Sequence, residues 1–181
     1  AIRNVASVRA ELGVTTIMNL LGPLTNPAGA RRQVVGVADP ERLELIAHAL
    51  RELGHENALV VHGEPGMDEL SPLGPTDVVE LRADQIRRYR IEPEAFGWPR
   101  FEAAQLAGGE PDENARLVRE VLSGQANGAA RAAVALNAGA ALYVAEITES
   151  LEAGVIEAER IIDAGAALET LEALRRASQE A

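Results

Sequence analysis

The most restrictive feature of the sequence is an alternation of two β-branched runs with one amphipathic helix. Gln33–Val37 (QVVGV) and Ala58–His62 (ALVVH) are typical of buried strands. Between them, Asp39 is typical of an N-cap, and Pro40 suits the first position of a helix. A helical pattern then covers Pro40–Leu53. A strand, a helix and a strand within about 30 residues predict a βαβ unit, whose strands are parallel and joined by a right-handed crossover.

Further strands and helices are expected after this unit. Thr76–Leu81 and Ile86–Ile91 are two strand candidates whose mixed polarity and proximity suggest an antiparallel addition at the edge of the sheet. Four helices are then predicted, at Pro111–Leu122, Ala129–Ala145, Leu151–Ala164 (capped by Ser150) and Ala166–Ala177. We therefore predict an α/β fold with a mainly parallel sheet flanked by helices over residues 31–181.

Residues 1–30 combine a helical pattern with a structured loop. One helix face carries the apolar residues Ile2, Val5, Val8 and Leu12. The dipeptides Gly22-Pro23 and Asn26-Pro27 mark turns. Because the chain opens inside an amphipathic helix without an initiator methionine, we interpret it as a fragment, with part of a small helical domain at its N-terminus.

Composition excludes several classes of function. The chain has no cysteine, and all 17 of its basic residues are arginine, so thiolate, Schiff-base and P-loop lysine chemistry are excluded. A formal net charge of −11 argues against a nucleic-acid partner, which requires a basic face. The longest apolar stretch, Ala132–Val144, is too short to span a membrane, and no secretory leader opens the chain. We expect a cytoplasmic protein.

The first candidate site is the loop HGEPGMDEL, which follows the second predicted strand. In open α/β sheets, ligands bind outside the carboxyl ends of the strands. Glu64, Asp68 and Glu69 could therefore hold Mg²⁺, which takes oxygen ligands and keeps waters and substrate phosphates. The alternative is that acidic loop residues are simply common in a chain of this charge.

Two other side chains also have two interpretations each. His62 ends the second strand and could act as a general acid or base, but we expect a structural role. Arg9 could bind a carboxylate through two parallel hydrogen bonds, or it could be a solvated helix arginine. The residues alone do not decide between these alternatives, and no catalytic residue is assigned.

A resemblance to a known family extends this interpretation. The segment VRAELGVTTIMNLLGPLTNPAG, with its unusual core NLLGPLTNP (Asn19–Pro27), resembles the signature of the anthranilate phosphoribosyltransferase family. The resemblance continues in the family's order through QVVGVADPERLELIAHALRELG, LVVHGEPGMDEL, LGPTDVVEL, GGEPDENARLVREVLSG and LNAGAALYVA. It covers essentially the whole chain.

The resemblance implies a fold, a reaction and a set of site residues. The family has a nucleoside phosphorylase/phosphoribosyltransferase-like fold and transfers the phosphoribosyl group of phosphoribosyl pyrophosphate to the amine of anthranilate, in tryptophan biosynthesis. Arg9 matches the arginine that contacts the anthranilate carboxylate, and Gly22 and Pro23 match part of the anthranilate channel. Asp68 and Glu69 match the acidic pair that coordinates Mg²⁺ on the pyrophosphate.

The resemblance also implies a missing part. The family's glycine-rich GTGGD phosphate loop and its KHGNR-like segment do not occur in this sequence. We therefore expect the C-terminal part of the enzyme, inactive without its N-terminal half and homodimeric when complete. The alternatives are a pyrimidine nucleoside phosphorylase and a related protein that binds nucleic acid. NLLGPLTNP and the MDEL loop favour the transferase over the former, and the net charge argues against the latter.

Overall fold

The structure is a computed structural model that describes residues 21–180. The chain divides into two compact units, Ala1–Ala30 and Arg31–Ala181. The described part of the first unit contains the short helix α2 (Leu21–Leu24), followed by a turn in which Gly29 N–H donates to the Asn26 carbonyl at 3.1 Å. The interpretation of residues 1–30 as part of a small helical domain and the anthranilate channel stays a prediction.

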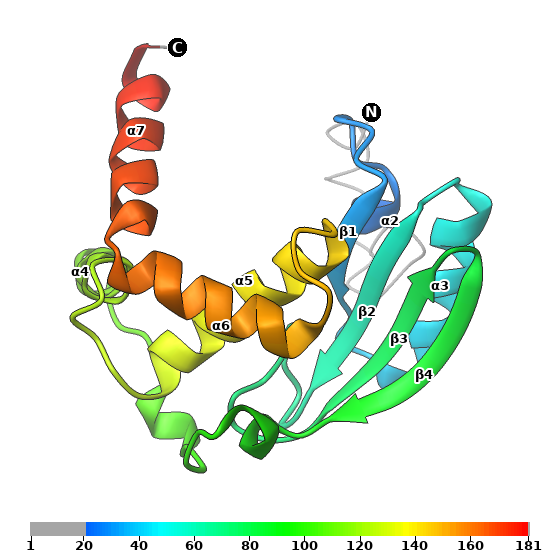
Figure 1. The fold of residues 1–181 in the computed structure, drawn as a ribbon, viewed down its shortest axis with the longest axis horizontal. Coiled ribbons are helices and arrows are strands. Elements are labelled where there is room, and N and C mark those ends of the chain that lie inside the picture. The colour runs from blue at the N-terminus through cyan, green and yellow to red at the C-terminus, as the bar shows by residue number, and fades with distance from the viewer. Residues whose placement is uncertain (1–20, 181) are drawn as a thin grey trace, which may run out of the picture. The chain divides into compact units, whose positions relative to one another are not determined.

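The second unit contains a sheet and its helices (Figure 1). The strands are β1 (Arg32–Gly36), β2 (Asn57–Gly63), β3 (Thr76–Arg82) and β4 (Gln85–Ile91), in the order β1-β2-β3-β4. The α-helices are α3 (Leu43–Glu52), α4 (Pro111–Leu122), α5 (Ala129–Val144), α6 (Leu151–Asp163) and α7 (Ala166–Glu180). Short 3-10 helices occur at Pro40–Arg42, Pro93–Phe96 and Ala103–Gln105.

The predicted βαβ unit is confirmed. β1 and β2 pair in parallel, with Val34 opposite Leu59, and α3 connects them. The Asp39 side chain accepts a hydrogen bond from Glu41 N–H at 3.1 Å, as expected for an N-cap. The helix differs from the expectation in its first turn, which is 3-10, so that α3 itself begins at Leu43, and it ends one residue earlier, at Glu52.

The α/β class and the antiparallel addition expected at Thr76–Leu81 and Ile86–Ile91 are confirmed. Among the described strands, however, the sheet is mixed where a mainly parallel sheet was expected. Only β1 and β2 pair in parallel, whereas β2–β3 and β3–β4 are antiparallel. The β3–β4 connection consists of Ala83 and Asp84, both at positive φ (48° and 64°), which is the geometry of a two-residue hairpin turn. Such a turn reverses the chain, because a parallel return needs a crossover of a dozen or so residues. The sheet of this chain is therefore mixed.

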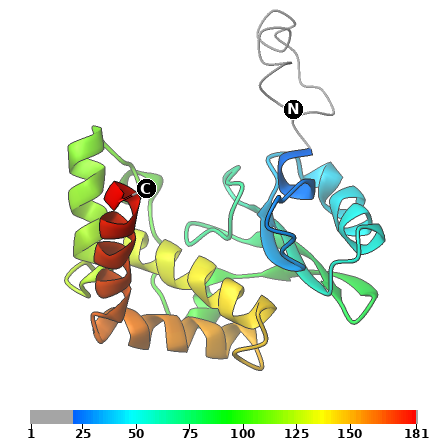
Figure 2. The same ribbon diagram turned by 90° about the horizontal axis from the view of Figure 1, so that it is seen from above.

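Helices cover both faces of the sheet, as Figures 1 and 2 show. α3 packs on one face against β2 and β3, and α5 packs on the other against β1 and β2. The core on the α5 side is formed by buried side chains of the sheet, α5 and α6, including Leu59, Val61, Val78, Leu136, Ala140 and Val155. α6 packs on α5, and a β-carbon at Gly139 would lie 2.5 Å from Val155 N, so glycine permits this close approach.

The helices after β4 contain no membrane span. Over residues 21–180, no helix is both long enough and apolar enough to cross a bilayer. α4 and α7 lie side by side near one end of the α5–α6 pair (Figure 2). Arg119 of α4 and Glu172 of α7 form an ion pair between the two helices.

Candidate functional site

The acidic loop, Gly63–Leu73, follows β2 at the edge of the sheet where β1 also ends. Its first turn closes on itself. Gly63 N–H donates to the Met67 carbonyl at 2.8 Å, and Met67 N–H donates to the Gly63 carbonyl at 2.7 Å. The chain therefore doubles back directly after β2 and brings Asp68 and Glu69 over the ends of the two parallel strands.

Two glycines allow the acidic pair to lie against the strand ends. A β-carbon at Gly36, the last residue of β1, would lie 1.5 Å from the Asp68 carbonyl oxygen. A β-carbon at Gly63 would lie 2.6 Å from the Glu69 carbonyl oxygen. Real β-carbons do not approach backbone this closely, so both positions require glycine if the loop is to keep its place.

The end of the acidic pair is held by helix α5. Asn137 Oδ1 accepts from Leu70 N–H at 3.0 Å, and Asn137 Nδ2 donates to the Leu70 carbonyl at 2.9 Å. The Leu70 side chain is fully buried in the core. Leu70 is thus fixed both by its side chain and by its backbone, immediately after Glu69.

The far side of the loop is closed by a second set of hydrogen bonds. Ser71 N–H donates to Thr76 Oγ1 at 3.0 Å, and Leu73 N–H donates to Ser71 Oγ at 3.1 Å. The Ser71 hydroxyl in turn donates to the Glu64 carbonyl. The loop is therefore bonded to itself and to the start of β3, so that a mobile shape is not expected.

The side chains of Asp68 and Glu69 are exposed, and their charges are not neutralised. Partial burial of the Glu69 carboxyl, followed by the charge of Asp68, raises its pKa. Within residues 21–180 neither carboxylate has an ion-pair partner, whereas Glu64 of the same loop pairs with Arg90. Two adjacent carboxylates without a counter-charge favour the binding of a cation.

The donor set fits a magnesium ion that is shared with a substrate. Among the described residues, no group of three or more His, Cys, Asp and Glu side chains is arranged to hold a metal. Mg²⁺ is commonly bound through one or two carboxylates, together with waters and substrate phosphates, rather than by a complete protein cage. The pair Asp68–Glu69 matches this partial ligand set.

The other predicted site residues have different outcomes. Arg9 lies outside the described residues. Gly22 and Pro23 lie in α2 of the first unit, and their contact with anthranilate stays a prediction. His62 Nδ1 bonds to the Val37 carbonyl at 2.8 Å, and because a carbonyl only accepts, this nitrogen carries the proton. This hydrogen bond agrees with the structural role expected for His62.

Three residues that shape the site were not among those predicted from the sequence. Asn137 lies within the apolar stretch Ala132–Val144, where an amide needs hydrogen-bond partners. Gly36 and Gly63 lie in or at the end of strands, where glycine often marks a close backbone approach. These signals identify the positions as unusual but do not identify Leu70, Asp68 or Glu69 as the groups they meet.

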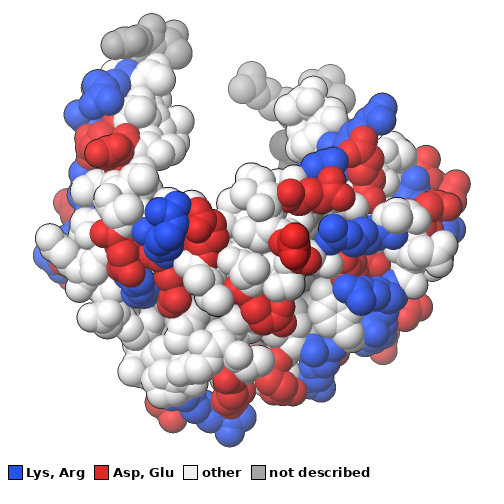
Figure 3. All heavy atoms as spheres, viewed as in Figure 1, with Lys and Arg blue, Asp and Glu red and all other residues white. Residues whose placement is uncertain are grey.

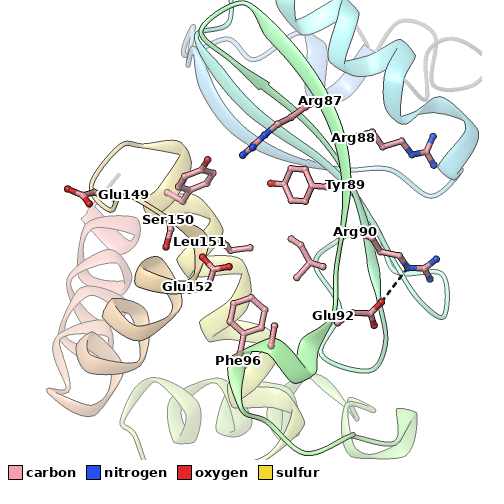
Figure 4. A pocket seen from close by; sticks show the side chains of 13 residues that line it. Arg87, Arg88, Tyr89, Arg90, Glu92, Phe96, Glu149, Ser150, Leu151 and Glu152 are labelled. Carbon is pink, nitrogen blue, oxygen red and sulfur yellow. Dashed lines mark ion pairs between the residues drawn. The ribbon is translucent and has the colours of Figure 1, made fainter.

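A separate pocket of 670 Å³ lies between β4 and the start of α6 (Figure 4). Arg87 and Tyr89 point into it, while Arg88 and Arg90 point away. Behind it, the buried Glu80 accepts from the Tyr143 hydroxyl at 2.7 Å and from Arg87 Nε at 2.8 Å. Among the described residues, none of the predicted site residues lines this pocket.

The charges on one face of the molecule are mixed in sign. On the face drawn in Figure 3, arginines are interspersed with acidic side chains rather than gathered into a basic patch. Several arginines of the described residues are in ion pairs, for example Arg32 with Glu146 at 2.7 Å. The expectation that the chain has no nucleic-acid partner stays a prediction.

Comparison with known proteins identifies the family. The profile of the glycosyl transferase family, a/b domain, matches residues 1–168. The chain belongs to this glycosyl transferase family. Among its curated relatives, anthranilate phosphoribosyltransferase of Rubrobacter xylanophilus is 52% identical over 179 residues. These residues are 99% of this chain and 52% of that protein. The enzyme of the same name from Brevibacillus brevis is 49% identical over 97% of this chain and 51% of its own length.

Solved structures of related proteins agree with this family. The crystal structure of anthranilate phosphoribosyltransferase from Thermus thermophilus has a TM-score of 0.88 and 50% identity, covering 94% of this chain and 50% of that one. The Saccharomyces cerevisiae enzyme in complex with PRPP and Mg has a TM-score of 0.83 and 31% identity, covering 93% and 48%. The chain spans about half the length of the relatives it matches.

Proposed function

We propose that this chain provides the metal-binding half of an anthranilate phosphoribosyltransferase. The complete enzyme would transfer the 5-phosphoribosyl group of phosphoribosyl pyrophosphate to the amine of anthranilate. The observation that carries the proposal is the acidic pair Asp68–Glu69, held over the ends of two parallel strands in a member of a glycosyl transferase family. The names of the relatives, at about half identity over nearly the whole chain, support the choice of substrates.

In the proposed reaction, the bond between the anomeric carbon and the pyrophosphate oxygen breaks, and a bond from that carbon to the anthranilate nitrogen forms. Pyrophosphate leaves with the bonding electrons, and the nitrogen loses a proton. Bound Mg²⁺ would neutralise the charge that develops on pyrophosphate. Asp68 and Glu69 would hold that ion in place. The aniline nitrogen is already a nucleophile, so orientation beside the ribose matters more than a strong base.

The remaining roles fall to other parts of the enzyme. Arg9 would bind the anthranilate carboxylate, and Gly22 and Pro23 would form part of its channel, within a helical unit of residues 1–30. The half of the relatives that this chain does not span would provide the glycine-rich phosphate loop and the dimer contacts. Activity would therefore require both halves. The cytoplasmic location expected from the sequence stays a prediction.

The test uses a reconstituted enzyme, made by combining this chain with the half of the Rubrobacter xylanophilus enzyme that the chain does not span. With phosphoribosyl pyrophosphate and Mg²⁺ present, the loss of anthranilate fluorescence measures how fast anthranilate is consumed. Asp68→Asn combined with Glu69→Gln removes both charges at nearly constant shape. We expect turnover to fall by about 10²-fold or more, the scale of losing one group that stabilises a developing anion.

A matched control exists in the same chain. Asp112 and Glu113 form a second adjacent Asp–Glu pair, exposed in the first turn of α4. Asp112→Asn with Glu113→Gln makes the same chemical change far along the chain, and it should leave turnover within about twofold of the parent, as expected for a surface change of small energetic effect. Equal activity of the two double variants would contradict the proposed role of Asp68 and Glu69.

A further inference from the structure

We propose that Asn137 is a positioning residue, which sets the place of the Asp68–Glu69 pair and thereby the affinity of the chain for a divalent cation. The inference rests on the proposed function, because it assigns Asn137 a role through the carboxylates that would hold the metal. Asn137 lies on α5, distant in sequence from the acidic loop, and its side chain is half-buried between the helix and the loop.

The Asn137 amide forms hydrogen bonds with both backbone groups of Leu70, its N–H and its carbonyl. Its Oδ1 accepts from Leu70 N–H at 3.0 Å, while its Nδ2 donates to the Leu70 carbonyl at 2.9 Å and to the Ala133 carbonyl at 3.0 Å. Both amide protons and the amide oxygen are therefore used. Among side chains of this size only an amide can both donate and accept in this geometry. An ionised aspartate lacks the donor, and alanine lacks both groups.

The position of Leu70 decides the position of the acidic pair. Leu70 directly follows Glu69, and the Asp68 backbone lies against Gly36 of β1. The pair is thus held between a strand end and the Asn137 amide, and its side chains are free to face a ligand. Groups that orient metal ligands in this way change metal affinity when they are removed, although they do not touch the metal.

A second asparagine provides a control for general effects on folding. Asn57 is buried at the start of β2, and its Nδ2 donates to the Val144 carbonyl at 3.3 Å near the end of α5. It also joins the sheet to α5, but it lies at the opposite end of β2 from the acidic loop. Asn57→Ala therefore removes a comparable sheet–helix hydrogen bond without a contact to Leu70.

The experiment titrates this chain with Mn²⁺, a paramagnetic ion that suits the same oxygen ligands as Mg²⁺. The readout is the broadening of the backbone amide signals of residues 68–70 in nuclear magnetic resonance spectra, which requires no enzymatic activity. We expect Asn137→Ala to raise the apparent Kd for Mn²⁺ by about 10-fold or more, the usual effect of removing a group that orients a metal ligand. Asn57→Ala should leave the Kd within about twofold, since it alters no group near the pair.

The outcomes separate this inference from the proposed function. Loss of selective broadening in Asp68→Asn with Glu69→Gln, but an unchanged Kd in Asn137→Ala, would overturn the positioning role and leave the metal role intact. Unchanged broadening in the double variant would instead contradict the metal role. If Asn137→Ala does not fold, Asn137→Asp serves in its place, because it keeps the size and the acceptor for Leu70 N–H. Equal weakening by Asn57→Ala would show a general effect on folding and would also overturn the inference.

Discussion

Substitution of Gly36 by alanine tests whether the acidic loop is held where the structure places it. The new β-carbon would lie 1.5 Å from the Asp68 carbonyl oxygen, whereas an ordinary contact begins at 3.4 Å. The carbonyl must therefore withdraw by about 1.9 Å, or β1 must shift by a comparable amount. Because Leu70 is fixed by Asn137 and by its buried side chain, the displacement would fall on Asp68 and Glu69.

The expected effect on activity exceeds the effect on stability. Overpacking of this kind costs about 1–3 kcal/mol of unfolding free energy. A misplacement of about 1 Å in a reacting group costs roughly 10²-fold in rate, so we expect turnover of the reconstituted enzyme to fall by at least about 10²-fold. Since the carboxylates themselves are unchanged, part of the loss should be recovered at higher Mg²⁺ concentration.

The assay combines urea unfolding with the anthranilate fluorescence measurement. Val35→Ala at the preceding position is the control, because Val35 is 4% exposed and its truncation lowers stability, by about 2 kcal/mol, without adding an atom near the loop. It should retain most of the turnover. A folded Gly36→Ala variant with turnover like that of Val35→Ala would refute the argument that close approach to Gly36 places the acidic pair.

Further predictions concern stability, pH and binding. Tyr143→Phe leaves an oxygen of the buried Glu80 without its 2.7 Å donor and should lower the unfolding free energy by about 1–3 kcal/mol in urea. Burial raises the pKa of Tyr89 and of Tyr143, so their contribution to stability is complete below the unfolded value of about 10 and is lost as the pH rises through the folded values. Unfolding curves should therefore show stability declining above about pH 10, and Tyr89→Phe should reduce that decline; an unchanged decline would contradict this cause. In calorimetry with Mg²⁺, this chain alone should bind phosphoribosyl pyrophosphate weakly, and tight binding would show that the other half is not needed for affinity. With its net charge of −11, the chain should pass through a heparin column unretained, and retention would revive the nucleic-acid alternative.

The βαβ unit could be predicted because all of its signals are local. The β-branched runs around Val35 and Val60, and the Asp39 cap followed by proline, act over a few residues, so sequence and structure agree there. The antiparallel addition of β3 and β4 was expected and is confirmed, but with a single parallel pair among the described strands the sheet is mixed and not mainly parallel. The two positive φ angles at Ala83 and Asp84 are not an obvious property of those residues.

The proposed chemistry of the site rests on the sequence, whereas the contacts that hold the site became visible only in the structure. Asp68 and Glu69 could be proposed from an acidic loop after a strand, and resemblance to a family gave them a role. Gly36 and Asn137 act through contacts with residues distant in sequence, and no local pattern specifies those partners. The tertiary contacts that hold the acidic pair in place could therefore not be predicted from the sequence.

The most direct test of the central claim compares this chain alone with the reconstituted enzyme in the anthranilate fluorescence assay, with phosphoribosyl pyrophosphate and Mg²⁺. We predict no activity of the chain alone and clear activity of the reconstituted enzyme, because the acidic pair and the phosphate loop would come from different halves. Activity of the chain alone would contradict the division of the site between two halves. A folded reconstituted enzyme that leaves anthranilate unchanged would contradict the proposed function itself.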